Sequence, residues 1–204
     1  MNSNKTVNPV VYRLLWILVR VGLFFWHPFS RFRGREHIPE GGCLIVANHS
    51  SMADPVWLLL ALGPGRRTHI IAKEEVMGVP VLGRVLRWVG VFGVDRGGAD
   101  IAAVKQSLEI LKNNEKLLIF PEGTRVKPGK TVEPKTGAAL MAQRTGVPVL
   151  PVYITQRKHP FCPIEVCFGA PYTVTAASRR ITAAELDEAT QHMMATIYGL
   201  ETAR

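Results

Sequence analysis

The chain has 204 residues and a formal net charge of +9 at pH 7, with 47% hydrophobic and 20% charged residues. This composition excludes wholesale disorder, and the length fits one domain with an appendage. The excess of Lys and Arg predicts an anionic partner, such as nucleic acid, a membrane surface or a phosphorylated small molecule. Three unevenly spaced cysteines, Cys43, Cys162 and Cys167, suit neither a disulfide framework nor a four-ligand zinc site.

The first expected element is a helix over Val10–Trp26, preceded by Asn8 and Pro9, a pair typical of a helix start. Seventeen residues rise about 26 Å, slightly less than the ~30 Å hydrocarbon core of a bilayer. In a spanning helix Arg20 would lie near the bilayer centre, at a cost of roughly 2.5–3.5 kcal/mol. Arg13 and Arg20 project from one side, because they are seven residues apart. We therefore expect an amphipathic helix that lies flat in the membrane surface.

Three arginines after this helix, Arg31, Arg33 and Arg35, add to the attraction for an anionic leaflet, at about 1 kcal/mol each. Two other interpretations of the helix remain open. It can be a signal peptide, although no small-residue cleavage site follows Trp26, or a buried core or dimer-forming helix.

From Gly41 onward, short apolar runs alternate with helical patterns, which is typical of an α/β fold with a mixed, mostly parallel sheet flanked by helices. The expected strands are Cys43–Ala47, His69–Ala72, Val91–Val94, Leu117–Phe120, Val149–Ile154 and Glu165–Phe168. The expected helices are Val56–Leu62, Val81–Trp88, Ile101–Asn113, Gly137–Thr145 and Ala183–Tyr198. Such folds bind ligands at the carboxyl ends of their strands.

His49 and Asp54 follow the first of these strands, separated by five residues. This spacing does not suit one helix face, so the two side chains meet only if a turn lies between them. A carboxylate that binds one imidazole nitrogen fixes the tautomer and leaves the other nitrogen free as a base. The alternative is structural: Asp54 before Pro55 can be a helix N-cap, and Ser51 with Asp54 forms a loose capping box.

Phe120–Arg125 (FPEGTR) follows another strand, and its Pro and Gly are expected to expose Glu122 and Arg125 at the strand end. Alone, this segment is equally a solvated turn. Lys73 ends one strand and Arg96 follows another, so three cations are expected to converge with Arg125 from three strand ends. An oxyanion such as phosphate suits that set.

Two other patterns carry no chemistry. Gly129–Thr131 imitates the end of a phosphate-binding P-loop, but the required first glycine is missing. Cys162 and Cys167 lack further ligands at metal spacing, so we predict no metal. Basic residues are not interleaved with stacking aromatics, which argues against nucleic acid.

Taken together, these residues resemble the glycerolipid acyltransferase family, in particular its bacterial 1-acyl-sn-glycerol-3-phosphate acyltransferases. The resemblance covers roughly residues 34–151 and rests on four motifs in the family's order. They are Asn48–Asp54 (NHSSMAD), Gly93–Arg96 (GVDR), Phe120–Arg125 (FPEGTR) and Val147–Pro151 (VPVLP). Four motifs in order are far more specific than any one of them.

The resemblance implies direct transfer of a fatty acyl group, without a covalent acyl-enzyme. His49 would be the general base on the acceptor hydroxyl, oriented by Asp54. In the family, cations of the second and third motifs bind the acceptor phosphate, which implies this role for Arg96 and Arg125, with Lys73 as a third contact. Glu122, Gly123 and Thr124 would then shape the acceptor site. No cofactor is implied; the acyl donor is a co-substrate, either acyl-CoA or acyl carrier protein.

The acceptor implied first is 1-acyl-sn-glycerol 3-phosphate (lysophosphatidic acid), whose acylation gives phosphatidic acid in phospholipid biosynthesis. Two alternatives stay open: the same chemistry on glycerol 3-phosphate, another lysophospholipid or an amino-acid lipid, and a non-catalytic basic module that binds anionic lipid. We expect residues 1–33 to attach the protein to the cytoplasmic face of the cell membrane, as a monotopic or single anchored helix. Residues 34–204 would form the acyltransferase domain.

The sequence departs from the family at two points. Val126 stands where many members carry serine, a change that we expect to be tolerated. The N-terminal region also offers one convincing membrane helix rather than a clear pair.

Overall fold

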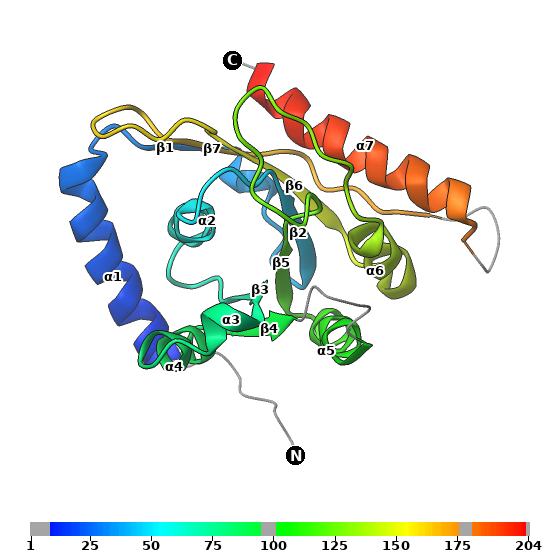
Figure 1. Cartoon of the computed structure of the whole chain (residues 1–204), viewed down its shortest axis with the longest axis horizontal. Helices are drawn as coiled ribbons and strands as arrows, with labels where there is room; N and C mark the ends of the chain where they lie inside the picture. The colour runs from blue at the N-terminus through cyan, green and yellow to red at the C-terminus, as the bar shows by residue number, and fades with distance from the viewer. Residues whose placement is uncertain (1–8, 95–100, 176–180, 203–204) are drawn as a thin grey trace.

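Helices cover both faces of a central sheet in the computed structural model of the chain, which describes residues 9–94, 101–175 and 181–202 (Figure 1). The helices are α1 (Pro9–Trp26), α2 (Asp54–Leu62), α3 (Glu74–Met77), α4 (Leu82–Trp88), α5 (Ile101–Lys112), α6 (Gly137–Thr145) and α7 (Ala183–Thr202), with a 3-10 helix at Arg35–His37. The strands are β1 (Arg31–Arg33), β2 (Cys43–Ala47), β3 (Thr68–Lys73), β4 (Val91–Val94), β5 (Lys116–Ile119), β6 (Val149–Ile154) and β7 (Glu165–Phe168).

The strands lie in the order β1-β7-β6-β2-β5-β3-β4. Every neighbouring pair is parallel except β6 and β7, so the sheet is mixed and mostly parallel. Strand β2 lies between β5 and β6, and the carboxyl ends of these three strands therefore meet at one edge of the sheet. This edge carries the polar motifs described below.

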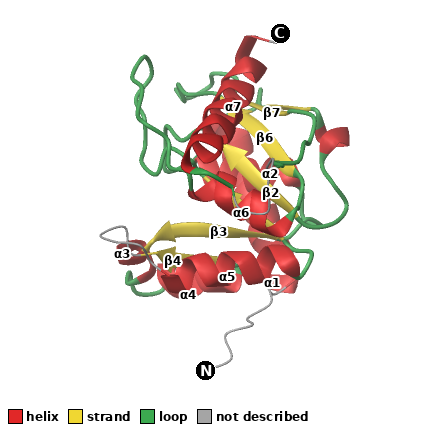
Figure 2. Ribbon diagram, turned by 90° about the vertical axis from the view of Figure 1, so that its right-hand side faces the viewer, coloured by secondary structure: helices red, strands yellow, loops and turns green. Residues whose placement is uncertain are grey.

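The central strands are apolar throughout because both faces of the sheet are covered. Cys43, Ile45 and Ala47 of β2 pack into a core with α1 and α2, around the buried Trp57. The alternate residues of β2 face a second core formed with α5, α6 and α7, around Met193. Figure 2 shows α6 and α7 beside β2 and β6.

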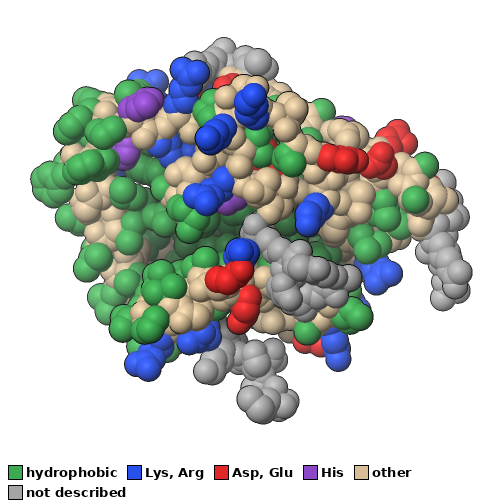
Figure 3. All heavy atoms as spheres, viewed as in Figure 1, with side chains coloured by type: hydrophobic (Ala, Val, Ile, Leu, Met, Phe, Trp, Pro, Cys, Tyr) green, Lys and Arg blue, Asp and Glu red, His purple; other side chains and the backbone are tan. Residues whose placement is uncertain are grey.

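Helix α1 packs against the domain with only one of its faces. Tyr12 is buried and its hydroxyl donates to the carbonyl of Arg66 at 3.4 Å, while Trp16 Nε1 donates to the carbonyl of Leu59 on α2 at 3.2 Å. The opposite face leaves large apolar side chains exposed: Val10, Leu14, Ile17, Leu18, Val21, Phe24 and Phe25. Figure 3 shows these hydrophobic side chains gathered along the edge that α1 forms. Within the described residues, α1 is the one helix that is long and apolar enough to cross a membrane.

The structure confirms the expected fold class and each expected strand and helix. The bounds of β2, β4, β6, β7 and α6 are those expected, and the other expected elements have shifted ends. Strand β1, the 3-10 helix and α3 were not predicted, because they are three or four residues long and too short for a periodic pattern. Helix α2 begins at Asp54, two residues earlier than expected, and β5 ends at Ile119, before Phe120.

Candidate active site

The site begins where β2 ends, at Asn48. Its side chain is fully buried and continues the pairing of β2 with β6, because Nδ2 donates to the carbonyl of Ile154 at 2.9 Å and Oδ1 accepts from the Ile154 N–H at 2.7 Å. These two bonds hold the backbone straight up to His49. The chain turns directly after it.

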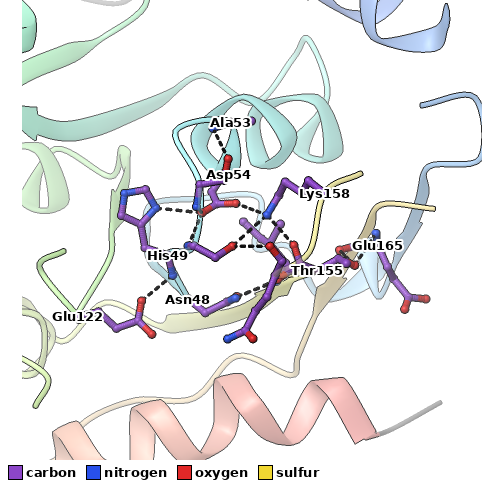
Figure 4. Close-up of polar contacts among 12 residues, drawn as sticks. Asn48, His49, Ala53, Asp54, Glu122, Thr155, Lys158 and Glu165 are labelled. Atoms are coloured by element: carbon purple, nitrogen blue, oxygen red, sulfur yellow. Dashed lines mark hydrogen bonds and ion pairs between the residues drawn. The ribbon is translucent and has the colours of Figure 1, made fainter. Parts of the chain in front are cut away.

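A turn brings His49 and Asp54 together, as the five-residue spacing required. Nδ1 of His49 lies 3.0 Å from Asp54 Oδ2, and the same oxygen accepts from the backbone N–H groups of Ser50 and Ser51 at 2.7 Å each (Figure 4). Asp54 is fully buried. The bond to Ser51 N–H is the capping interaction that the structural alternative expected, but Asp54 is the first residue of α2 and Ala53 is its N-cap.

These contacts fix the tautomer of His49. Burial raises the pKa of Asp54, but the hydrogen bond from His49, the Lys158 ammonium and the Ser51 N–H outweigh it and hold that pKa below its ordinary value. An ionised carboxylate only accepts hydrogen bonds, so the imidazole proton is on Nδ1. In the neutral ring the lone pair is then on Nε2, which has no hydrogen-bond partner among the described residues. The ring stacks on Phe120, with centroids 4.2 Å apart and planes at 21°.

Lys158 completes the ion pairing of Asp54. Lys158 lies on the loop that follows β6, and its Nζ is 2.5 Å from Asp54 Oδ1 (Figure 4). Sequence reasoning missed this residue, although it follows the predicted strand Val149–Ile154 closely and so belongs to the edge of the sheet where a site was expected.

Glu122 contradicts the expectation that it is exposed. Its side chain is 3% exposed, and both carboxylate oxygens are occupied: Oε2 accepts from the backbone N–H of His49 and Oε1 from the hydroxyl of Tyr198 on α7, each at 2.6 Å. Burial raises the pKa of Glu122, and the bonds from Tyr198 and His49 oppose this rise. The buried Glu122 carboxylate therefore fixes the backbone position of His49. The sequence held no signal for Tyr198.

The loop formed by the FPEGTR segment and Val126, the residue after it, also contacts the backbone carbonyl of His49. The backbone N–H of Val126 donates to the carbonyl of His49 at 2.7 Å, and the Val126 side chain is buried. Gly123 has φ of +64°, and an added Cβ would lie 3.0 Å from Lys135 Cε, so a side chain here would strain the loop. Thr124 and Arg125 are exposed at the carboxyl end of β5.

Two of the three expected phosphate-binding cations lie within the described residues. Lys73 is exposed at the end of β3 and pairs with Glu75 at 2.5 Å. Arg125 follows β5, which lies between β2 and β3. Arg96 lies outside the described residues. Both described cations thus lie on the edge of the sheet that carries His49, on strands to one side of β2.

Chemically, the arrangement is an oriented base. A neutral imidazole with a free nitrogen accepts a proton from a hydroxyl, and the buried carboxylate stabilises the imidazolium that forms. Among the described residues no group of three His, Cys, Asp or Glu side chains is placed to hold a metal ion.

Comparisons with known proteins find similar chains among acyltransferases. The chain is 32% identical, over 68% of its length and 40% of the relative's, to a chloroplastic 1-acyl-sn-glycerol-3-phosphate acyltransferase of Brassica napus. It is 34% identical, over 59% of its length and 47% of the relative's, to a 1-acyl-sn-glycerol-3-phosphate acyltransferase of Pseudomonas aeruginosa. The chain spans less than half the length of these two relatives.

A solved structure, the 1-acyl-sn-glycerophosphate (LPA) acyltransferase PlsC from Thermotoga maritima, is similar with a TM-score of 0.69 and 26% identity, over 94% of this chain and 79% of that one. The family model described as Acyltransferase matches residues 30–155, which include the HxxxxD and FPEGTR segments. On this match, which covers more than half of the sequence, the chain belongs to the acyltransferase family.

Proposed function

We propose that the protein transfers a fatty acyl group from an acyl thioester to the sn-2 hydroxyl of 1-acyl-sn-glycerol 3-phosphate, which gives phosphatidic acid for phospholipid biosynthesis. The observation that carries this proposal is the His49–Asp54 pair, 3.0 Å apart, with Nε2 of His49 left free. Several relatives of the chain carry the name of this activity.

In this mechanism, Nε2 of His49 takes the proton of the sn-2 hydroxyl while its oxygen attacks the thioester carbonyl carbon. Asp54 holds the Nδ1 proton and stabilises the imidazolium. The tetrahedral intermediate then collapses and the C–S bond breaks. The imidazolium returns the proton to the leaving thiolate, so that the products are phosphatidic acid and a free thiol, and no acyl-enzyme forms.

The acceptor phosphate requires cations, because a dianion desolvated at a protein surface needs several compensating charges. We assign this role to Arg125 and Lys73, which lie on the same edge of the sheet as His49, and to Arg96. The exposed side chains of Thr124 and Arg125 and the sharp turn at Gly123 would form the wall of the acceptor site. Glu122 acts on that site indirectly, through the backbone of His49.

The outer face of α1 would hold the active site at a membrane. The inner face of α1 packs on α2, so lipid cannot surround the helix. This packing favours a helix that lies in the membrane surface over one that spans the membrane. We propose that residues 1–33 form this membrane-binding segment, at the cytoplasmic face of the cell membrane, and that residues 34–204 form the acyltransferase domain. The end of the segment, β1, joins the two because it pairs with β7 in the sheet. No cofactor enters the scheme; coenzyme A or acyl carrier protein delivers the acyl group.

A panel of acceptors tests the proposal. Purified protein in liposomes would receive a long-chain acyl-CoA, or acyl carrier protein as a second donor, with lysophosphatidic acid, glycerol 3-phosphate, a lysophospholipid with a larger headgroup or a monoacylglycerol. We expect phosphatidic acid from lysophosphatidic acid as the main product. Preferred acylation of an acceptor without a phosphomonoester would contradict the assignment, and no product from any pair would contradict the enzymatic function.

A further inference from the structure

Lys158 is a lysine enclosed within the site. Its side chain is 8% exposed, and Nζ lies 2.5 Å from Asp54 Oδ1, 3.1 Å from Ser50 Oγ and 2.5 Å from the carbonyl oxygen of Thr155. The ammonium group donates hydrogen bonds to Ser50 Oγ and to the Thr155 carbonyl, and its contact with Asp54 Oδ1 is an ion pair. The geometry is that of a fixed internal cation and not of a flexible surface lysine.

The loop that carries Lys158 is fixed at its far side as well. The backbone N–H of Phe161 donates to the carbonyl of Trp26 at 2.9 Å, and His27 Nδ1 lies 3.1 Å from the carbonyl oxygen of Cys162. Both contacts join the loop to the end of α1. The position of Lys158 is therefore set by the β6 end on one side and by α1 on the other.

The two oxygens of Asp54 have separate partners. Oδ2 faces His49 and the N–H groups of Ser50 and Ser51, while Oδ1 faces Lys158. Without Lys158, the carboxylate would present an uncompensated negative charge to the imidazole. With Lys158, the carboxylate has a cation at Oδ1 in addition to the three N–H groups at Oδ2, and its negative charge is offset.

From these contacts we infer that Lys158 is a positioning residue for the acyl transfer: it fixes the Asp54 carboxylate that orients His49 and offsets the negative charge that this carboxylate presents to the imidazole. The inference rests on the proposed function for its role in catalysis. The electrostatic effect on His49 can be measured without any substrate.

The other titratable groups near His49 do not replace Lys158. Glu122 approaches from the loop after β5 and accepts from the backbone N–H of His49. Tyr198 approaches from α7, and its hydroxyl donates to Glu122. Neither brings a positive charge. Burial raises the pKa of Glu122, which opposes a second negative charge close to His49.

The test compares Lys158→Gln, which removes the charge but keeps a hydrogen-bond donor, with Lys158→Arg, which keeps the charge. Arg157→Gln is the matched control. Arg157 is the residue before Lys158, its side chain is exposed, and the substitution likewise removes one positive charge. The protonation of His49 would be followed by NMR of protein with ¹³C-labelled histidine, with the His49 signal identified by its loss in His49→Ala. The pH profile of kcat/KM for acyl transfer would be recorded on the same proteins.

We expect Lys158→Gln to move the midpoint of His49 protonation upward by on the order of one pH unit, because the loss of a nearby positive charge stabilises the imidazolium. The acid limb of the kcat/KM profile should move by the same amount. Lys158→Arg and Arg157→Gln should keep the wild-type midpoint. An unchanged midpoint in Lys158→Gln, or an equal shift in Lys158→Arg, would overturn the inference. A wild-type protein inactive on every acceptor would contradict the proposed function but leave the NMR result intact.

A second comparison covers the case in which Lys158→Gln alone does not fold, since it leaves a buried carboxylate without its cation. The double variant Asp54→Asn/Lys158→Gln removes both charges and has no such defect. Its His49 midpoint should lie above that of Asp54→Asn, because the two proteins differ only in the Lys158 charge. Equal midpoints in these two proteins would equally overturn the inference.

Discussion

The backbone N–H of His49 donates to Glu122 Oε2 at 2.6 Å, and this bond joins the two segments that carry the candidate chemistry. Val126 binds the His49 carbonyl from the same loop, so both backbone groups of His49 are held by the segment that follows β5. The position of the base therefore depends on a carboxylate that is itself buried and has no direct access to a substrate.

Replacement of Glu122 tests this dependence. Leucine has a similar size but no acceptor, so in Glu122→Leu the His49 N–H and the Tyr198 hydroxyl both lose this partner. An unsatisfied buried donor costs about 1–3 kcal/mol in unfolding free energy. We expect reduced stability in urea unfolding and a reduced kcat. Glu188→Leu, at an exposed position on α7, is the control and should change neither. Wild-type stability in Glu122→Leu would contradict the role described for this carboxylate.

The ionisation of Asp54 gives a pH prediction. Its pKa is below the ordinary value in the folded state, so the stability it contributes is present above that ordinary value and is lost as pH falls through the folded pKa. The difference in unfolding free energy between wild type and Asp54→Asn should therefore be largest near neutral pH and shrink as the pH falls below about 4. A difference that stays constant between pH 6 and pH 2 would refute the ionised pair.

Arg125 provides a test of phosphate binding. Arg125→Ala should lower kcat/KM for lysophosphatidic acid by roughly 10- to 100-fold, since a hydrogen bond to a charged group contributes about 1.5–3 kcal/mol. Activity on a monoacylglycerol, which lacks the phosphate, should change much less. Lys127→Ala removes an exposed cation two residues away and serves as the control. If both acceptors lose activity equally, Arg125 acts elsewhere than at the phosphate.

The outer face of α1 predicts membrane binding. Leu18 is 70% exposed on this face, and Leu18→Asp would place a charge in the apolar interface and weaken binding to anionic liposomes by at least about 10-fold. Ile101→Asp introduces the same charge at a 79% exposed position on α5, across the sheet from α1, and should leave binding unchanged (Figure 1). Cosedimentation with liposomes measures both, and equal binding by the two variants would contradict this surface.

Long apolar runs made much of the fold predictable. Strands β2 and β6 are buried on both faces, so Cys43–Ala47 and Val149–Ile154 stand out from their polar surroundings. The spacing of His49 and Asp54 allowed their contact through a turn but left helix capping by Asp54 open, and the structure shows the contact. Strand β1 was not predictable, since Arg31–Arg33 is a short, charged segment whose pairing with β7 depends on distant residues.

Contacts between remote segments account for what the sequence did not disclose. Lys158 and Tyr198 reach the site only through tertiary packing, and their residue types are common on protein surfaces. Glu122 looked exposed because Pro and Gly flank it, whereas the turn directs its carboxylate inward to the His49 N–H. Local pattern thus pointed to His49 and Asp54 as candidates, and the groups that hold them required the structure.

The central claim is that His49 is the base of an acyl transfer. The most direct measurement is the rate of phosphatidic acid formation from lysophosphatidic acid and an acyl thioester by wild type and His49→Ala, with His192→Ala, an exposed histidine on α7, as the control. We expect His49→Ala to lose roughly 10²- to 10⁴-fold in kcat while it keeps the wild-type unfolding transition, and His192→Ala to retain full activity. Wild-type turnover by a folded His49→Ala protein would contradict the account.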